Sequence, residues 1–149
     1  MREDIEILLS FLNIIDRIRN ADEIREDKER ILTDFLKAYY SDMYEIEKLH
    51  LGDKYDKANK SYCVELKRNI FKTYWHNDES YYSPCSVGDR AEFDWNLVSN
   101  IRFFEKGDDD HHLYLVSIIY QDIVKNVRVY LIEYKDGKLG IQQEFFEVI

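Results

Sequence analysis

Hydrophobic positions recur every three to four residues in the first half of the chain, and nearly every second residue in the last third. This spacing predicts an amphipathic helix over residues 3–19, followed by a second helix that ends near residue 45. Asn20 and Glu23 are spaced as a capping box for the second helix. The charged stretch 25–30 within it is interpreted as a solvated face. The apolar positions of the second helix are Ile24, Ile31, Leu32, Phe35, Leu36, Tyr39, Tyr40 and Met43.

A break is predicted at Gly52-Asp53, after which a helical period resumes over residues 59–75. Asn59 or Ser61 is the expected N-cap of this third helix. Its apolar stripe is expected to consist of Tyr62, Leu66, Ile70 and Tyr74. Residues 76–88 include Pro84, the single proline of the chain, and are predicted to form a loop.

Four strands are predicted after this loop. The first spans Asn96–Lys106, the second Leu113–Gln121 and the third Val127–Tyr134, and the last begins at Leu139. The dipeptide Asp136-Gly137 favours a type I′ hairpin turn, which requires positive φ at both central residues. We therefore expect one α+β domain over residues 1–149, with N-terminal helices packed on one face of an antiparallel sheet from the C-terminal half.

Composition excludes several classes of protein. The chain of 149 residues is 45% hydrophobic and 15% aromatic, which is too apolar for intrinsic disorder. No apolar run reaches the roughly 18–20 residues that span a bilayer. Glu3, Asp4 and Glu6 stand where a signal peptide carries positive charge, so the expected location is the cytoplasm. Cys63 and Cys85 are too few for a disulfide framework, and whether they pair is left open.

The formal net charge is −9, and most of the acidic excess falls between residues 78 and 110. Such a field repels nucleic acid and anionic membranes, and it attracts a basic protein. The alternative is that the acidity serves solubility alone. The nine acids of this region are Asp78, Glu79, Asp89, Glu92, Asp94, Glu105, Asp108, Asp109 and Asp110.

Known catalytic and cofactor motifs are missing from the sequence: it contains no P-loop, GxGxxG, HExxH, CxxC or GxSxG. The run from Asp108 to His112 contains metal-ligating residue types, and His112 could bind zinc or a softer divalent ion. Consecutive side chains of an extended tip point in opposite directions, however, so the run is interpreted as a charged hairpin tip. We expect neither a metal nor a cofactor.

Two further candidates for chemistry have simpler structural interpretations. Asp94 beside Trp95 could act as an acid or base with a raised pKa, or it could cap a turn while the indole fills the core. Cys63 could be a nucleophile with His76 or His50 as base, or a buried inert thiol on a helix face. In both cases the structural interpretation is favoured, so no catalytic residue is assigned.

Tyrosines and tryptophans are more numerous than a core of this size needs, and such side chains anchor protein interfaces. Tyr81 and Tyr82 lie beside acidic residues in the predicted loop, which suggests an exposed acidic and aromatic binding surface. The residues predicted to bind a partner are Asp78, Glu79, Tyr81, Tyr82, Asp94, Trp95, Asp108, Asp109 and Asp110.

The order of elements resembles the nuclear transport factor 2-like fold, in which helices pack into a curved sheet to form a cone. The resemblance rests on ILTDFLKAYYSDM (31–43), NKSYCVELKRNI (59–70), DWNLVSNIRFF (94–104) and the closing LYLVSIIYQDIVKNVRVYLIEYKDGKLGIQ. Enzymes of that superfamily, such as polyketide cyclases, hold an acid–base pair in the cone. Here only Asp94 matches such a pair, so the resemblance does not imply enzymatic activity. Other members, the immunity proteins that neutralise polymorphic toxins, fit the acidity better.

Three hypotheses follow. The first is a non-catalytic binding protein, most specifically a cytosolic immunity protein that holds a basic toxin domain. The second is a cone-shaped small-molecule binder or enzyme of the polyketide-cyclase type, with Asp94 in its pocket. The third is a structural or homodimeric module whose sheet face pairs with that of a second copy.

Overall fold

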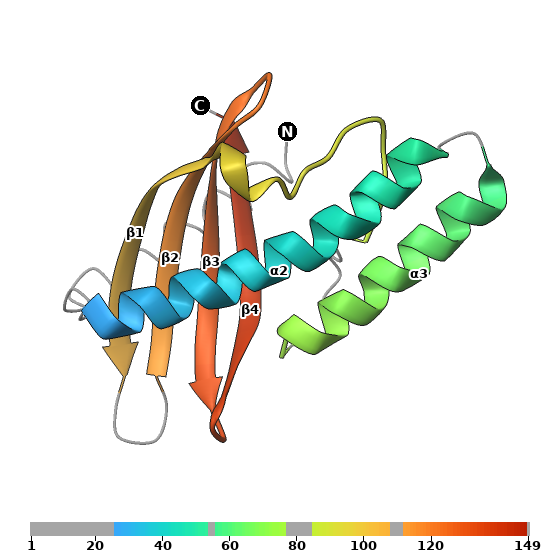
Figure 1. Cartoon of the computed structure of the whole chain (residues 1–149). Helices are drawn as coiled ribbons and strands as arrows, with labels where there is room; N and C mark the ends of the chain where they lie inside the picture. The colour runs from blue at the N-terminus through green and yellow to red at the C-terminus, as the bar shows by residue number, and fades with distance from the viewer. Residues whose placement is uncertain (1–25, 54–55, 77–84, 108–111, 149) are drawn as a thin grey trace, which may run out of the picture. The chain divides into compact units, whose positions relative to one another are not determined.

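The computed structural model describes residues 26–53, 56–76, 85–107 and 112–148. These residues form two long helices followed by a four-stranded antiparallel sheet, which confirms the predicted α+β class (Figure 1). The chain divides into two compact units. One comprises residues 30–97, and the other comprises the sheet from Val98 onward together with the first turn of the first described helix. The predicted packing of helices on the sheet, and the single domain, stay predictions. The helix expected over residues 3–19 and the capping box at Asn20 lie outside the described residues.

Helix α2 spans Glu26–Gly52, so it ends at the predicted break and not near residue 45. The backbone N–H of Asp53 donates to the carbonyl of His50 at 3.1 Å and closes the last turn. Of the apolar positions expected on its buried face, Ile31 is instead 51% exposed. The buried side chains recur every three to four residues, as an amphipathic helix requires. They are Leu32, Leu36, Tyr39, Tyr40, Met43, Glu47 and His50.

Helix α3 spans Lys57–Tyr74, and the cap predicted for it was wrong. Asp56 is the N-cap, and its Oδ1 accepts a hydrogen bond from Ala58 N at 2.9 Å. The helix begins earlier than expected because this carboxylate satisfies a free N–H of the first turn.

The predicted stripe of α3 was also displaced by one position. Tyr62 is 58% exposed, and the residues buried on α3 are Cys63, Lys67 and Phe71. The sequence pattern missed this stripe because its central member is charged.

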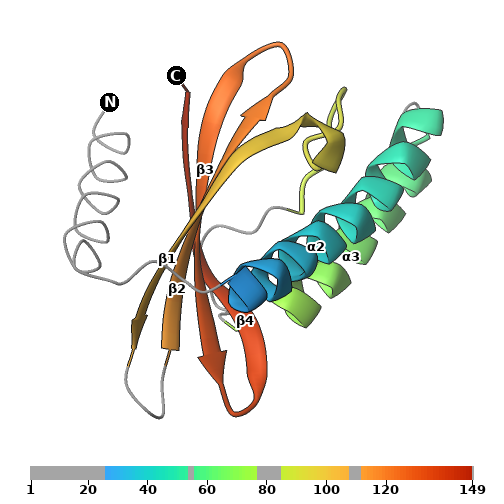
Figure 2. The ribbon, with the colours of Figure 1, turned by 60° about the vertical axis from the view of Figure 1, so that its left-hand side comes forward.

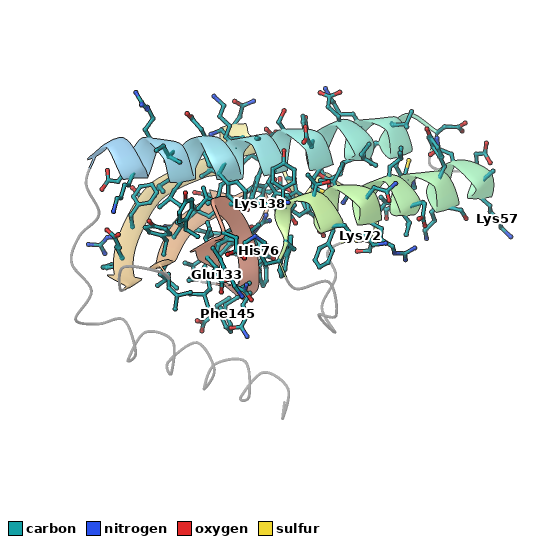
Figure 3. The ribbon with its side chains drawn as sticks, turned by 90° about the horizontal axis from the view of Figure 1, so that it is seen from below. Lys57, Lys72, His76, Glu133, Lys138 and Phe145 are labelled. Atoms are coloured by element: carbon teal, nitrogen blue, oxygen red, sulfur yellow. The ribbon has the colours of Figure 1, made fainter. Side chains whose placement is uncertain are left out.

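Helices α2 and α3 run antiparallel and side by side (Figures 1 and 2). At one end, Tyr74 packs against Tyr39 and Phe35, with ring centroids 5.3 and 5.5 Å away. The indole Nε1 of Trp75 donates to the Tyr39 hydroxyl at 3.3 Å. On α3, the exposed Lys57 is the first residue and the exposed Lys72 lies in the last turn (Figure 3). Aromatic side chains therefore join the two helices where α3 ends.

The sheet is a meander of strands in the order β1-β2-β3-β4, as predicted. The strands are β1 (Val98–Gly107), β2 (His112–Gln121), β3 (Lys125–Lys135) and β4 (Lys138–Val148). β1 starts two residues later than expected because Trp95–Leu97 forms a 3-10 turn. The turn between β3 and β4 is as predicted, with φ of 55° at Asp136 and 74° at Gly137.

Both faces of the sheet carry buried side chains, which explains the almost continuous apolar runs of β2 and β3. On one face, Leu115, Val129 and Leu131 form a buried cluster. Glu133 and Phe145 lie on this same side of the sheet (Figure 3). The opposite face buries tyrosines and branched aliphatic residues. They are Tyr114, Val116, Ile118, Tyr120, Tyr130 and Ile132.

Candidate functional site

A buried ion pair joins the two helices within the unit of residues 30–97. Lys67 Nζ of α3 lies 3.2 Å from Glu47 Oε2 of α2, and the two side chains are 0% and 4% exposed. Each residue continues the buried stripe of its own helix. Burying two charges is unfavourable unless further hydrogen bonds satisfy them, so the remaining partners of both groups decide what the pair does.

Glu47 binds the backbone of the segment that follows the predicted loop. Its Oε2 accepts from Glu92 N at 2.8 Å, and its Oε1 accepts from Phe93 N at 2.9 Å. Lys67 Nζ also donates to the carbonyl of Ser86 at 3.0 Å. We call Glu47 and Lys67, with the backbone groups of these three residues, the Glu47–Lys67 clamp. It fixes residues 86–93 to α2 and α3.

Two kinds of effect act in opposite directions on the pKa of Glu47. Burial raises the pKa of the Glu47 carboxyl, whereas the Lys67 ammonium and the N–H groups of Glu92 and Phe93 act to lower this pKa. Both carboxylate oxygens accept hydrogen bonds from these donors, which take up most of the acceptor capacity of Glu47. The arrangement is suited to holding a segment of backbone.

Aromatic rings reinforce the clamp at Phe93. The Phe93 ring packs edge-on against Tyr39 and Tyr40, with centroids 5.5 and 5.1 Å away, and Lys67 Nζ lies 5.1 Å from its centre. The Trp95 ring packs edge-to-face against Tyr40, with ring centroids 5.3 Å apart. The segment is therefore fixed by backbone hydrogen bonds and by its own side chains.

Asp94 and Trp95 belong to the predicted partner-binding set, and both are half-buried. Asp94 Oδ1 accepts from Asn96 N at 3.1 Å, and its carbonyl accepts from Leu97 N at 3.0 Å. This is the turn-capping role expected from the sequence. The structure thus brings these two residues together directly after the clamp.

Cys63 is fully buried, as expected for an inert thiol. Its Sγ donates to Asn59 Oδ1 at 3.6 Å, and burial raises its pKa. A raised pKa disfavours the thiolate, which is the nucleophilic form. His50, one of the two bases considered for it, is buried, and its Nδ1 has no hydrogen-bond partner among the described residues.

Most of the predicted acidic surface lies outside the described residues. These partner-binding candidates are Asp78, Glu79, Tyr81, Tyr82, Asp108, Asp109 and Asp110, and the metal-ligand candidate His111 lies outside as well. Among the acids that are described, Asp89 and Glu92 are exposed. Glu105 forms an ion pair with Lys28 at 2.8 Å, which compensates its charge. Within residues 26–53, 56–76, 85–107 and 112–148, no group of three His, Cys, Asp or Glu is placed to hold a metal ion.

Glu47 and Lys67 were not singled out from the sequence, although a signal was present. Glu47 stands four residues after Met43 on the apolar stripe of α2, and Lys67 stands between Cys63 and Phe71. Two opposite charges on the apolar stripes of consecutive helices are expected to pair, because an unpaired buried charge is strongly unfavourable.

Among the helices described, none is both long and apolar enough to cross a membrane. Comparisons with protein-family models, with curated proteins and with solved structures found no match.

Proposed function

We propose that this chain is a non-catalytic binding protein that recognises a basic protein partner through acidic and aromatic residues. The most specific form of the proposal is an immunity protein that neutralises a basic toxin domain. The nuclear transport factor 2-like cone belongs to the same proposal, because the immunity role was inferred from that resemblance.

The observation that carries the proposal is that the Glu47–Lys67 clamp holds residues 86–93 in place. A buried carboxylate and a buried ammonium both fix residues 86–93, which lead directly into Asp94 and Trp95. A rigidly held segment loses little conformational entropy when a partner binds it, and preorganisation of this kind favours recognition. Asp89 and Glu92 are exposed on this segment and present negative charge.

Side chains considered for catalysis have structural roles instead, which also supports a binding protein. Asp94 caps a turn, and Cys63 is buried with a raised pKa. The acidic excess of residues 78–110 suits electrostatic attraction of a cationic surface.

The test is to recover partners with the tagged full chain and then to express the captured protein in bacteria. We expect a basic partner whose toxicity is relieved when this chain is co-expressed. A chain with Asp108, Asp109 and Asp110 all replaced by Asn should associate more slowly and show a weaker salt dependence. Recovery of an acidic partner would contradict the proposal, and a basic partner that is not toxic would remove only the immunity role.

A further inference from the structure

One end of the sheet exposes apolar side chains that a monomer normally buries. Ile123 and Val124, in the turn between β2 and β3, are 78% and 47% exposed. Phe146 and Val148 on β4 are 48% and 57% exposed. Val148 pairs with Asn126 just after that turn, so these residues belong to the same end of the sheet. Figures 1 and 2 show the β2–β3 turn and the C-terminal end of β4 at this end. Exposed apolar side chains that gather at one end of a sheet are typical of interaction sites.

β4 also offers a backbone edge at this end. Within the described sheet it pairs on one side only, with β3. Natural proteins protect such edges with lysine, proline or bulges. The irregularity in the β3–β4 register lies before Gln143, and the half of β4 from Gln143 to Val148 contains neither lysine nor proline.

We infer that the Gln143–Val148 half of β4 is a strand-addition site for an extended, basic and apolar segment of the partner. The inference rests on the proposed function, since it assigns a surface to the same basic partner. Strand addition gains affinity from backbone hydrogen bonds and specificity from the side chains that alternate along the edge. Phe146 and Val148 would contact apolar residues of the added strand. They lie on the face where Arg128 Cζ is 6.0 Å from the centre of the Phe146 ring.

Charge favours a basic partner over a second copy of this chain. Residues 143–148 contain two glutamates and neither lysine nor arginine, so a second copy would bring only like charge to this edge. Like charges directly opposite one another destabilise a strand pair. A lysine or arginine opposite each glutamate removes this repulsion and adds a favourable cross-strand pair.

The experiment uses the full chain and a designed peptide, acetyl-TVKVTKT-amide, which places valines opposite Phe146 and Val148 and lysines opposite the two glutamates. Hydrogen–deuterium exchange is measured with and without the peptide. With the peptide at four times its dissociation constant, exchange across 143–148 should slow about fivefold. The matched peptide TVEVTET should give no protection. The same lysine peptide with alternate backbone nitrogens methylated should also give none, because it cannot form the ladder.

Two exposed positions provide variants that leave the core intact. Val148→Lys and Glu147→Lys should each weaken peptide binding about tenfold at low salt, whereas Ile31→Lys, at an exposed apolar site on α2, should not. Protection elsewhere, or equal binding of the methylated peptide, would overturn the inference. A concentration-dependent dimer protected at 143–148 would assign the edge to a second copy. If the captured partner binds the Val148→Lys chain unchanged, the inference fails while the proposed function stands.

Discussion

Replacing Glu47 with glutamine tests whether the clamp fixes residues 86–93. The substituted side chain would keep its shape, but its amide NH₂ would face a donor in either orientation: the N–H of Phe93 in one, and the N–H of Glu92 with the Lys67 ammonium in the other. Removing one partner of a buried ion pair leaves the other charge without compensation and costs about 3–5 kcal/mol. Because a whole domain is stable by only about 5–15 kcal/mol, Glu47→Gln should be strongly destabilising.

The second part of this prediction concerns the pair and not the single residues. A buried ion pair often adds little net stability over two well-packed apolar side chains, because removing both charges from water is costly. Lys67→Met alone should also be strongly destabilising. The free energy of unfolding lost in the double variant should be smaller than the sum of the losses in the two single variants, by a coupling energy of at least about 1 kcal/mol.

Urea denaturation at pH 7, followed by tryptophan fluorescence, measures these free energies of unfolding. The matched control is Glu45→Gln, because Glu45 is paired with Lys48 on the surface of the same helix, and its side chain is 66% exposed. This control should change stability by no more than about 0.5 kcal/mol. A loss below about 1 kcal/mol for Glu47→Gln, or additive effects of the two substitutions, would refute the clamp.

Three smaller predictions concern other parts of the chain. The pKa of Tyr74 is raised to about 12 by burial and by its 2.6 Å hydrogen bond to Asp42, so Asp42→Asn should lower it in an NMR titration of labelled tyrosine. Gly137→Ala should cost about 1 kcal/mol by urea denaturation, because φ is +74°, whereas Gly52→Ala should not be destabilising. The buried Cys63 and Cys85 thiols should react with Ellman's reagent only after denaturation, and rapid labelling of the native chain would show this placement to be wrong.

Local patterns predicted the sheet better than the helices. The β3–β4 turn could be foreseen because Asp136-Gly137 satisfies a backbone requirement that few dipeptides meet. The strands followed from runs of branched and aromatic residues. The predicted start of α3 was wrong because Asp56, three residues before Asn59, accepts the hydrogen bond from Ala58 N and caps the helix.

The clamp could not be predicted from local patterns alone. Its groups come from α2, from α3 and from the segment 86–93, which are distant in the sequence. Glu92 and Phe93 contribute backbone N–H groups, which every residue other than proline has, so the identity of their side chains does not indicate this role. Asp94 was correctly predicted as a turn cap because an Asx turn requires only neighbouring residues. The buried stripe of α3 was not predicted because it includes Lys67. A lysine is normally interpreted as exposed to solvent, unless a buried carboxylate is known to face it.

The association rate constant of the full chain with its captured partner, measured by surface plasmon resonance at about 50 and 300 mM salt, tests the central claim most directly. If acidic residues steer a basic partner, the rate constant should fall steeply at the higher salt concentration. Truncating Tyr81 or Tyr82 should instead speed dissociation, by the equivalent of about 1–3 kcal/mol if either is an anchor. An association rate that does not change with salt would contradict the account.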